Sequence, residues 1–453
     1  MRLYNTLTGA IEEFKVDRNT VNMYVCGITP YAPSHLGHAM CAVVFDTLRR
    51  YMEYKGYLVN HIQNFTDIDD KMISGAALEG IPVVELAERN MDKYLQELKS
   101  LNVKPASKFP RATHEIESII NIIQGLIENG MAYAQGGDVY FRVRKKDDYG
   151  KLSNRKLEDL VAGARLEIDG EKEYPGDFAL WKSYKNGEPF WESPWGKGRP
   201  GWHIECTAMS IEYLGESIDI HGGGLDLVFP HHENEIAQSE SFTGVKPFAR
   251  FWVHNGTLQY GSDKMSKSIG NVFSIGQALE KYSSDDLRMF FLNSHYRRPL
   301  TYSEEIVGNQ SRAVERLRNA LMATSGEGPQ MECDTYEAKF CEAMDDDINT
   351  PRALAVLFEL AREINKGSSE GHGIDEAQEV LSVLAGVLGF TLMQPQQDSK
   401  GDIEPFVEIL INTRIKLRES KLFEFADQIR DELLSQGVVL EDSTDGTDWK
   451  YLS

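Results

Sequence analysis

Short apolar segments alternate with helical patterns in two parts of this chain, and the alternation indicates its fold class. The predicted strands are Val21–Cys26, Tyr57–Phe65, Ser217–His221 and Phe251–His254. Helical patterns separate them, one reaching about Lys55 and another spanning Pro230–Ser241. Strands that alternate with helices form a parallel sheet covered on both faces. The sequence therefore predicts an α/β fold with a doubly wound, Rossmann-type sheet, and a turn at Gly222–Gly224.

The loop after the first predicted strand is a candidate anion site. It runs Gly27-Ile-Thr-Pro-Tyr-Ala-Pro-Ser-His-Leu-Gly-His38 and ends where a helical pattern begins. In a parallel sheet this loop lines the nucleotide crevice, and the helix after it offers free N–H groups and the positive end of its dipole. His35 and His38 flank Gly37 three residues apart, so both can face one phosphate. The alternative is a pair of capping or surface histidines.

A second candidate anion site lies in the loop Gln259-Tyr-Gly-Ser-Asp-Lys-Met-Ser-Lys-Ser-Ile-Gly-Asn271, which has no apolar periodicity. Lys264 and Lys267 can place two positive charges on a polyphosphate, and Ser266 and Ser268 can donate hydrogen bonds. A charged, solvated turn is the other interpretation of this loop taken alone. Both loops are expected at the carboxyl edge of the same sheet.

His35-Leu-Gly-His38 and Lys264-Met-Ser-Lys-Ser268 resemble the two signature motifs of class I aminoacyl-tRNA synthetases, in the same order. Further stretches resemble the cysteinyl-tRNA synthetase family, namely Tyr24-Val-Cys-Gly27, Thr66-Asp-Ile-Asp-Asp-Lys71, Gly201-Trp-His-Ile-Glu-Cys206, His221-Gly-Gly-Gly224, Phe229-Pro-His-His-Glu-Asn-Glu235 and Gly446-Thr-Asp-Trp449. The resemblance covers nearly the whole chain. It implies ATP with Mg²⁺, L-cysteine and cysteine tRNA as partners, cysteinyl-adenylate as the intermediate, and a monomer.

The resemblance also implies a zinc site formed by Cys26, Cys206, His231 and Glu235. No Cys-x-x-Cys pair is present, so spacing alone is a weak signal. Four residues apart on one predicted helix, His231 and Glu235 share a face, whereas His232 and Glu233 are expected to point elsewhere. Two thiolates, an imidazole and a carboxylate suit Zn²⁺ better than Mg²⁺. Such a metal would bind a substrate thiolate in preference to the hydroxyl of serine, which shape alone rejects poorly.

Four further residues are candidate substrate contacts in stretches that resemble family motifs. Thr66 is expected to cap a helix and border the site, Trp202 to wall the thiol pocket, and His203 and His221 to lie close to substrate. The alternatives are a plain helix cap, a core tryptophan and hydrogen-bonded polar histidines. No general base for the transfer step is evident.

The net charge of −22 argues against a general nucleic-acid binder, because phosphates are neutralised by lysine and arginine. Any tRNA surface should therefore be confined to basic clusters, and we expect contacts from Arg414, Lys416, Arg418 and the aromatic ring of Trp449. A solvated helix face is the alternative for these residues. The five cysteines are too few for a disulfide scaffold, and no signal peptide or apolar run of about 20 residues is present, which predicts a cytoplasmic protein.

Changes of pattern along the chain predict six parts. They are residues 1–107 and 201–273 as the two halves of the nucleotide-binding domain, 108–200 as an inserted acceptor-end-binding subdomain, 274–324 as a helical stem-contact region, 325–393 as an all-α bundle, and 394–453 as a small anticodon-binding subdomain. Two other functions fit part of the pattern. A cysteine:amino-sugar ligase of mycothiol synthesis would share the zinc site but would not need the last part, and a non-catalytic tRNA-binding paralogue would not need both anion sites and a metal.

Overall fold

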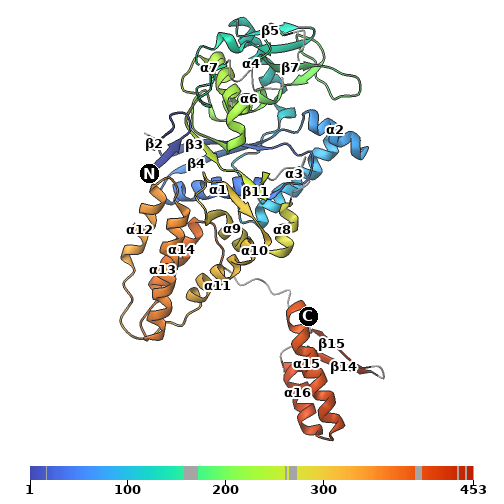
Figure 1. Cartoon of the computed structure of the whole chain (residues 1–453), viewed down its shortest axis with the longest axis vertical. Coiled ribbons are helices and arrows are strands. Elements are labelled where there is room, and N and C mark those ends of the chain that lie inside the picture. The colour runs from blue at the N-terminus through green and yellow to red at the C-terminus, as the bar shows by residue number, and fades with distance from the viewer. Residues whose placement is uncertain are drawn as a thin grey trace. The chain divides into compact units, whose positions relative to one another are not determined.

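The computed structural model describes residues 1–16, 18–157, 172–260, 263–264, 273–392, 400–435, 438–443 and 446–451 (Figure 1). The chain forms two compact units, Met1–Leu392 and Met393–Ser453. No described helix combines the length and the apolar character needed to cross a lipid bilayer.

A four-stranded sheet with all strands parallel, in the order β10-β9-β3-β4, forms the centre of the first unit. Its strands are β3 (Thr20–Ile28), β4 (Leu58–Phe65), β9 (Ile218–Gly224) and β10 (Ala249–Asn255). Helix α1 (Leu36–Tyr54) connects β3 to β4. The predicted doubly wound fold is therefore confirmed.

Alternation along β3 distributes its side chains between two cores. Val21, Met23 and Val25 join the large cluster that contains the buried face of α1, whereas Tyr24 and Cys26 join a second cluster with Cys206. Successive strand residues point to opposite faces of a sheet. The period of two thus places Cys26 on the face covered by α6 (Trp202–Leu214).

Two predicted local structures differ from those observed. Asp69, not Thr66, caps α2 (Asp70–Glu79), because the Asp69 carboxylate accepts the N–H of Met72 at 2.7 Å while Thr66 lies buried before the helix. Gly222–Gly224 do not form a turn, since they continue β9 in register with β10. Helix α3 (Val83–Ser100) follows α2.

The insertion begins with η1 (Ala112–His114) and α4 (Ile116–Glu128), followed by an antiparallel sheet in the order β5-β6-β7-β8. Its strands are β5 (Ala132–Gln135), β6 (Asp138–Phe141), β7 (Phe178–Ser183) and β8 (Gly198–Pro200), with η2 (Val143–Lys145) after β6. Strands β5 and β6 form a hairpin in which Gln135 pairs with Asp138. One hydrophobic cluster joins α4 and this sheet to α6 and to α7 (Glu233–Thr243), and Figure 1 shows these elements together.

The rest of the first unit is mainly helical. Its elements are β11 (Leu258–Tyr260), β12 (Asp263–Lys264), α8 (Ile275–Lys281), α9 (Ser284–Leu292), β13 (Leu300–Tyr302), α10 (Glu304–Gly308), α11 (Gln310–Leu321), α12 (Asp334–Asp345), α13 (Thr350–Ser369) and α14 (Asp375–Val387). The region predicted as helical over residues 274–324 contains four helices, α8 to α11, and the short strand β13. The N-terminal pair β1 (Arg2–Asn5) and β2 (Ala10–Glu13) is antiparallel.

The second unit consists of α15 (Lys400–Glu419), α16 (Phe423–Ser435) and the antiparallel pair β14 (Val438–Ser443) and β15 (Gly446–Tyr451). It has a small apolar core of its own, formed by Val407, Ile411, Leu433, Val438 and Leu440.

Candidate functional site

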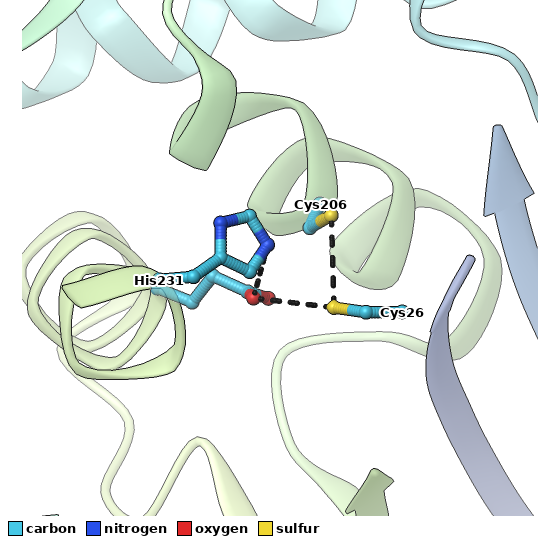
Figure 2. A group of neighbouring side chains, drawn as sticks. Cys26, Cys206 and His231 are labelled. Atoms are coloured by element: carbon cyan, nitrogen blue, oxygen red, sulfur yellow. Dashed lines mark hydrogen bonds and ion pairs between the residues drawn. The ribbon is translucent and has the colours of Figure 1, made fainter. Parts of the chain in front are cut away.

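Two buried cysteines face each other between the central sheet and α6. Cys26 lies within β3, two residues before its end, and Cys206 lies on α6. Their sulfur atoms are 3.9 Å apart, and both cysteines are buried and form no disulfide. Figure 2 shows these side chains pointing toward each other and toward His231.

His231 and Glu235 complete the group from the other side. His231 lies in an irregular π-turn, η4 (Val228–His232), and Glu235 lies in the first turn of α7. The His231 Nε2 atom is 3.1 Å from Glu235 Oε1, and that oxygen is 3.6 Å from the sulfur of Cys26. All four predicted zinc ligands therefore converge, and their ligand atoms lie within 4.8 Å of one another.

The spacing of these atoms fits a tetrahedral metal ion. With Zn–S of about 2.3 Å and Zn–N or Zn–O of about 2.0 Å, tetrahedral ligands lie about 3.8 Å apart for two sulfurs, 3.5 Å for sulfur and oxygen, and 3.3 Å for nitrogen and oxygen. The corresponding distances here are 3.9, 3.6 and 3.1 Å. The donor set of two sulfurs, one nitrogen and one oxygen is also one that zinc prefers over magnesium.

Burial controls the protonation of this group in the absence of a cation. It raises the pKa of the Cys26 thiol well above its usual value, with further contributions from Cys206 and Glu235. Burial likewise raises the pKa of the Glu235 carboxyl and lowers that of His231. An isolated thiolate or carboxylate charge is thus costly here. Metal ligands must be deprotonated, and the positive charge of a bound cation would offset the cost of those negative charges.

Two more histidines lie beside these ligands. His232 Nε2 is 3.3 Å from the sulfur of Cys26, so the prediction that His232 points elsewhere is wrong. His221 Nε2 is 2.8 Å from Glu235 Oε2. Cys26, His221, His232 and Glu235 form an alternative ligand group, sharing two members with the first. His232 also bonds through Nδ1 to His254 Nε2 at 2.8 Å, an interaction that orients its ring.

Trp202 and His203 form one side of the site at the start of α6. The Trp202 ring stacks on His231 with centroids 4.4 Å apart, and His203 Nδ1 is 2.9 Å from His231 Nδ1. Burial lowers the pKa of His203 to about 3, so its ring is neutral. Trp202 is 40% exposed, which leaves part of its ring available to a ligand and does not fit a core tryptophan.

A cleft of about 310 Å³ opens beside Trp202 and His203. Thr29, Asp70, Lys182 and Arg199 are among its other lining residues. Arg199 is buried and pairs with Asp70, which also pairs with Lys182 at 2.6 Å. No local sequence pattern identifies Arg199 as a site residue, because its partner Asp70 lies 129 positions earlier in the chain.

The first candidate anion site lies at the start of α1. His35 precedes the first helical residue, and its ring stacks on His38 with centroids 3.8 Å apart. The N–H of His35 donates to His38 Nδ1 at 3.3 Å, so His38 also caps the helix. Gly37 lies against the His35 ring, where a Cβ would be 2.9 Å from its Cε1 atom.

The second candidate anion site is described only in part. Ser266, Lys267 and Ser268 lie outside the described residues, and only the backbone of Lys264 is described, paired with Gln259 in β12 and β11. The chain just after this loop pairs with the first site, since the N–H of Leu36 donates to Phe273 O at 3.1 Å and that of Ile275 to Ser34 O at 3.0 Å. The segment that follows the second motif is therefore hydrogen-bonded to the first motif at the start of α1.

Comparisons with known proteins agree with this geometry. Residues 12–312 match the family model of the tRNA synthetases class I (C) catalytic domain, and residues 339–393 match the DALR domain. A cysteine–tRNA ligase of Dehalococcoides mccartyi is 54% identical, and one of Carboxydothermus hydrogenoformans is 48% identical; 99% of this chain and at least 99% of each relative are covered. The chain belongs to the cysteine–tRNA ligase family. It is accordingly an ATP-dependent aminoacyl-tRNA ligase of class I.

The fold of this cysteine–tRNA ligase family member is shared with other class I synthetases. Methionyl-tRNA synthetase of Mycobacterium tuberculosis, solved in complex with methionyl-adenylate, superposes with a TM-score of 0.60 at 17% identity, covering 82% of this chain and 89% of that one. Identity this low supports the fold alone.

The predicted tRNA contacts of this family member lie in the second unit. Lys416 and Arg418 are exposed on α15, and Trp449 is partly buried in β15. Arg414 is only 1% exposed, so its assignment as a phosphate contact is corrected: a buried guanidinium does not reach a phosphate on the surface.

Proposed function

We propose that this chain activates L-cysteine with ATP to cysteinyl-adenylate, releasing pyrophosphate, and transfers the cysteine to the terminal adenosine of cysteine tRNA. The observation that carries the proposal is the convergence of Cys26, Cys206, His231 and Glu235 in one buried group of a class I synthetase fold. Thiol-ligating residues at this place suit an amino acid whose side chain is itself a thiol. We further expect the protein in the cytoplasm and as a monomer.

These four residues would hold one Zn²⁺. When bound, the metal supplies a Lewis-acid centre that a thiolate ligates strongly and an alcohol ligates weakly at neutral pH. Trp202 stacks on His231 and would form one wall of the pocket for the substrate side chain, while His203 would orient His231. His221, which lies against Glu235, and the buried Thr66 would contact the substrate.

In the activation step the substrate carboxylate attacks the α-phosphorus of ATP, which binds with Mg²⁺. Positioning and charge stabilisation dominate such a reaction. His35, Gly37 and His38 at the N-terminus of α1 would hold the phosphate that is attacked. Lys264, Ser266, Lys267 and Ser268 would bind the departing pyrophosphate. Lys416, Arg418 and Trp449 would bind the tRNA.

The amino-sugar ligase and the non-catalytic paralogue have less support. Cysteine–tRNA ligases align with 99% of this chain, including the second unit, for which a ligase of a small sugar has no use. An intact buried ligand group likewise serves no purpose in a module that only binds tRNA.

The test is aminoacylation of total tRNA with labelled cysteine, ATP and Mg²⁺, with and without removal of zinc by a chelator. We expect cysteine to be charged onto tRNA, and charging to stop when zinc is removed. Cysteine-dependent pyrophosphate exchange without charging would favour the amino-sugar ligase, and neither activity would favour the paralogue. Cys206→Ser should lose zinc and lower cysteine activation by about 100-fold or more, because even residues that only hydrogen-bond a metal ligand change affinity or activity by about 10 to 100-fold. Normal activation by this variant with serine still excluded would contradict the proposed role of the metal.

A further inference from the structure

Residues 146–153 of the insertion bind the face of α7 that points away from the candidate metal ligands. Glu233 and Glu235 are two positions apart, which is about 200° around an α-helix. Glu235 points toward Cys26, so Glu233 points away from it. We call residues 146–153 the insertion clamp.

The insertion clamp surrounds the carboxylate of Glu233 with donors. Glu233 is 1% exposed, and it accepts the N–H groups of Gly150 at 2.9 Å, Leu152 at 3.1 Å and Ser153 at 2.8 Å. The hydroxyl of Ser153 donates a fourth hydrogen bond at 3.0 Å. A carboxylate with several donors is held strongly, because charge-assisted hydrogen bonds are about twice as strong as neutral ones.

Further contacts continue along the same helix. The Tyr149 hydroxyl donates to Asn234 Oδ1. Lys146 and Lys151 contact Glu240 Oε2 at 2.6 and 2.7 Å, and both Lys146 and Glu240 are buried. The insertion clamp therefore binds α7 over two turns.

Apolar packing accounts for only part of the burial of α7, through Ile236, Ala237 and Phe242. Its sequence, Glu-Asn-Glu-Ile-Ala-Gln-Ser-Glu-Ser-Phe-Thr, has few apolar residues, and the π-turn before it contains an extended residue, Phe229. A metal site needs its ligands held within about 0.5 Å of the productive geometry. Polar contacts on the far side of α7 are suited to supply that constraint.

We propose that the insertion clamp positions α7 so that His231 and Glu235 reach a shared metal ion, with Glu233 as its principal positioning residue. The inference rests on the proposed function in taking that ion as Zn²⁺. It assigns to the inserted subdomain a second task, support of the metal centre.

The test measures zinc affinity directly. Metal-free protein is titrated with Zn²⁺ in competition with a chromophoric chelator, and Co²⁺ absorption reports ligand geometry. Glu233→Gln keeps the shape but turns an N–H group toward the clamp donors, so we expect zinc to bind about 10 to 100 times more weakly and the Co²⁺ spectrum to change. Glu212→Gln makes the same change at an exposed position on the neighbouring α6 and should leave both unchanged.

A second variant covers failure of the first to fold. Tyr149→Phe removes only the hydrogen bond to Asn234, and it should weaken zinc binding several-fold with little effect on the thermal midpoint. Unchanged affinity in a folded Glu233→Gln protein, or in Tyr149→Phe if the first variant is unfolded, overturns the inference. Wild-type protein that binds no zinc would instead overturn the proposed function, so the two failures are distinguishable.

Discussion

His61 is a buried histidine of β4 that lies outside the candidate site. It is 6% exposed, and neither of its ring nitrogens has a hydrogen-bond partner within the described residues. Burial, helped by the positive charge of Arg49, lowers the pKa of His61 to about 3. Below pH 6.5 the unfolded chain gains a proton there that the folded chain does not, so stability is lost as the pH falls toward 3.

This difference predicts a pH effect on the free energy of unfolding. At pH 5 the loss from His61 should be about 2 kcal/mol relative to pH 7.5. His61→Phe should remove it, and urea unfolding at both pH values measures the change. His372→Phe, at a partly exposed position, is the matched control. An equal pH dependence in wild type and His61→Phe would contradict the assignment.

Single residues of the candidate site were predictable where a local rule applied. The four-residue spacing of His231 and Glu235 places their side chains together, as expected, with His231 Nε2 3.1 Å from Glu235 Oε1. The same rule failed for His232, because it assumed a regular helix from Pro230, whereas Phe229 is extended and the turn that follows is wider than an α-helical turn. No pattern in the sequence predicts such an irregular turn.

At the scale of elements, substitutions at Asp69 test whether this residue caps the N-terminus of α2. Asp69→Ala should lower the free energy of unfolding by about 1 kcal/mol, because it removes the acceptor for the N–H of Met72. Asp69→Asn keeps an acceptor and should cost much less. Urea titration measures both, and equal losses in the two variants would mean that the charge of Asp69 matters rather than the cap.

The sheet and most helices could be predicted from periodicity, but contacts between distant segments could not. Gly222 and Gly223 were predicted as a turn because glycine favours turns. Here they continue a strand, and glycine is needed because neighbouring side chains leave no room for a Cβ. A Cβ at Gly222 would lie 2.2 Å from the ring of Phe45, and one at Gly223 would lie 3.0 Å from that of His232. Close approach and turn formation both use glycine, and sequence alone does not separate them.

At the scale of the first unit, Arg288 joins the nucleotide-binding part to the helical part. The side chain is fully buried and pairs with Asp46 of α1. It also donates to the carbonyl groups of Leu101 at 2.7 Å, Asn102 at 2.8 Å and Leu388 at 2.9 Å. These contacts explain why the first unit is compact across boundaries that the sequence placed at residues 273 and 324.

Removing this arginine should therefore be costly. Arg288→Ala leaves Asp46 buried without its cation, and we expect a loss of about 3 to 5 kcal/mol in the free energy of unfolding. Arg352→Ala, which breaks pairs of a half-exposed arginine with Glu342 and Asp346, should cost no more than about 1 kcal/mol. Similar losses in the two variants would show that the buried network does not hold the first unit together.

The division of the chain into two units allows the two steps of the proposed reaction to be separated. All candidate zinc ligands and both histidines of the α1 motif belong to Met1–Leu392, whereas exposed Lys416 and Arg418 belong to the second unit, which has its own core. A chain ending at Leu392 should therefore keep cysteine-dependent pyrophosphate exchange close to that of the full chain. Its KM for tRNA in charging should rise by about tenfold or more, equivalent to at least 1.4 kcal/mol of lost binding. Loss of exchange in a folded truncated protein would mean that the second unit takes part in activation, and unchanged charging would mean that the tRNA surface lies entirely within the first unit.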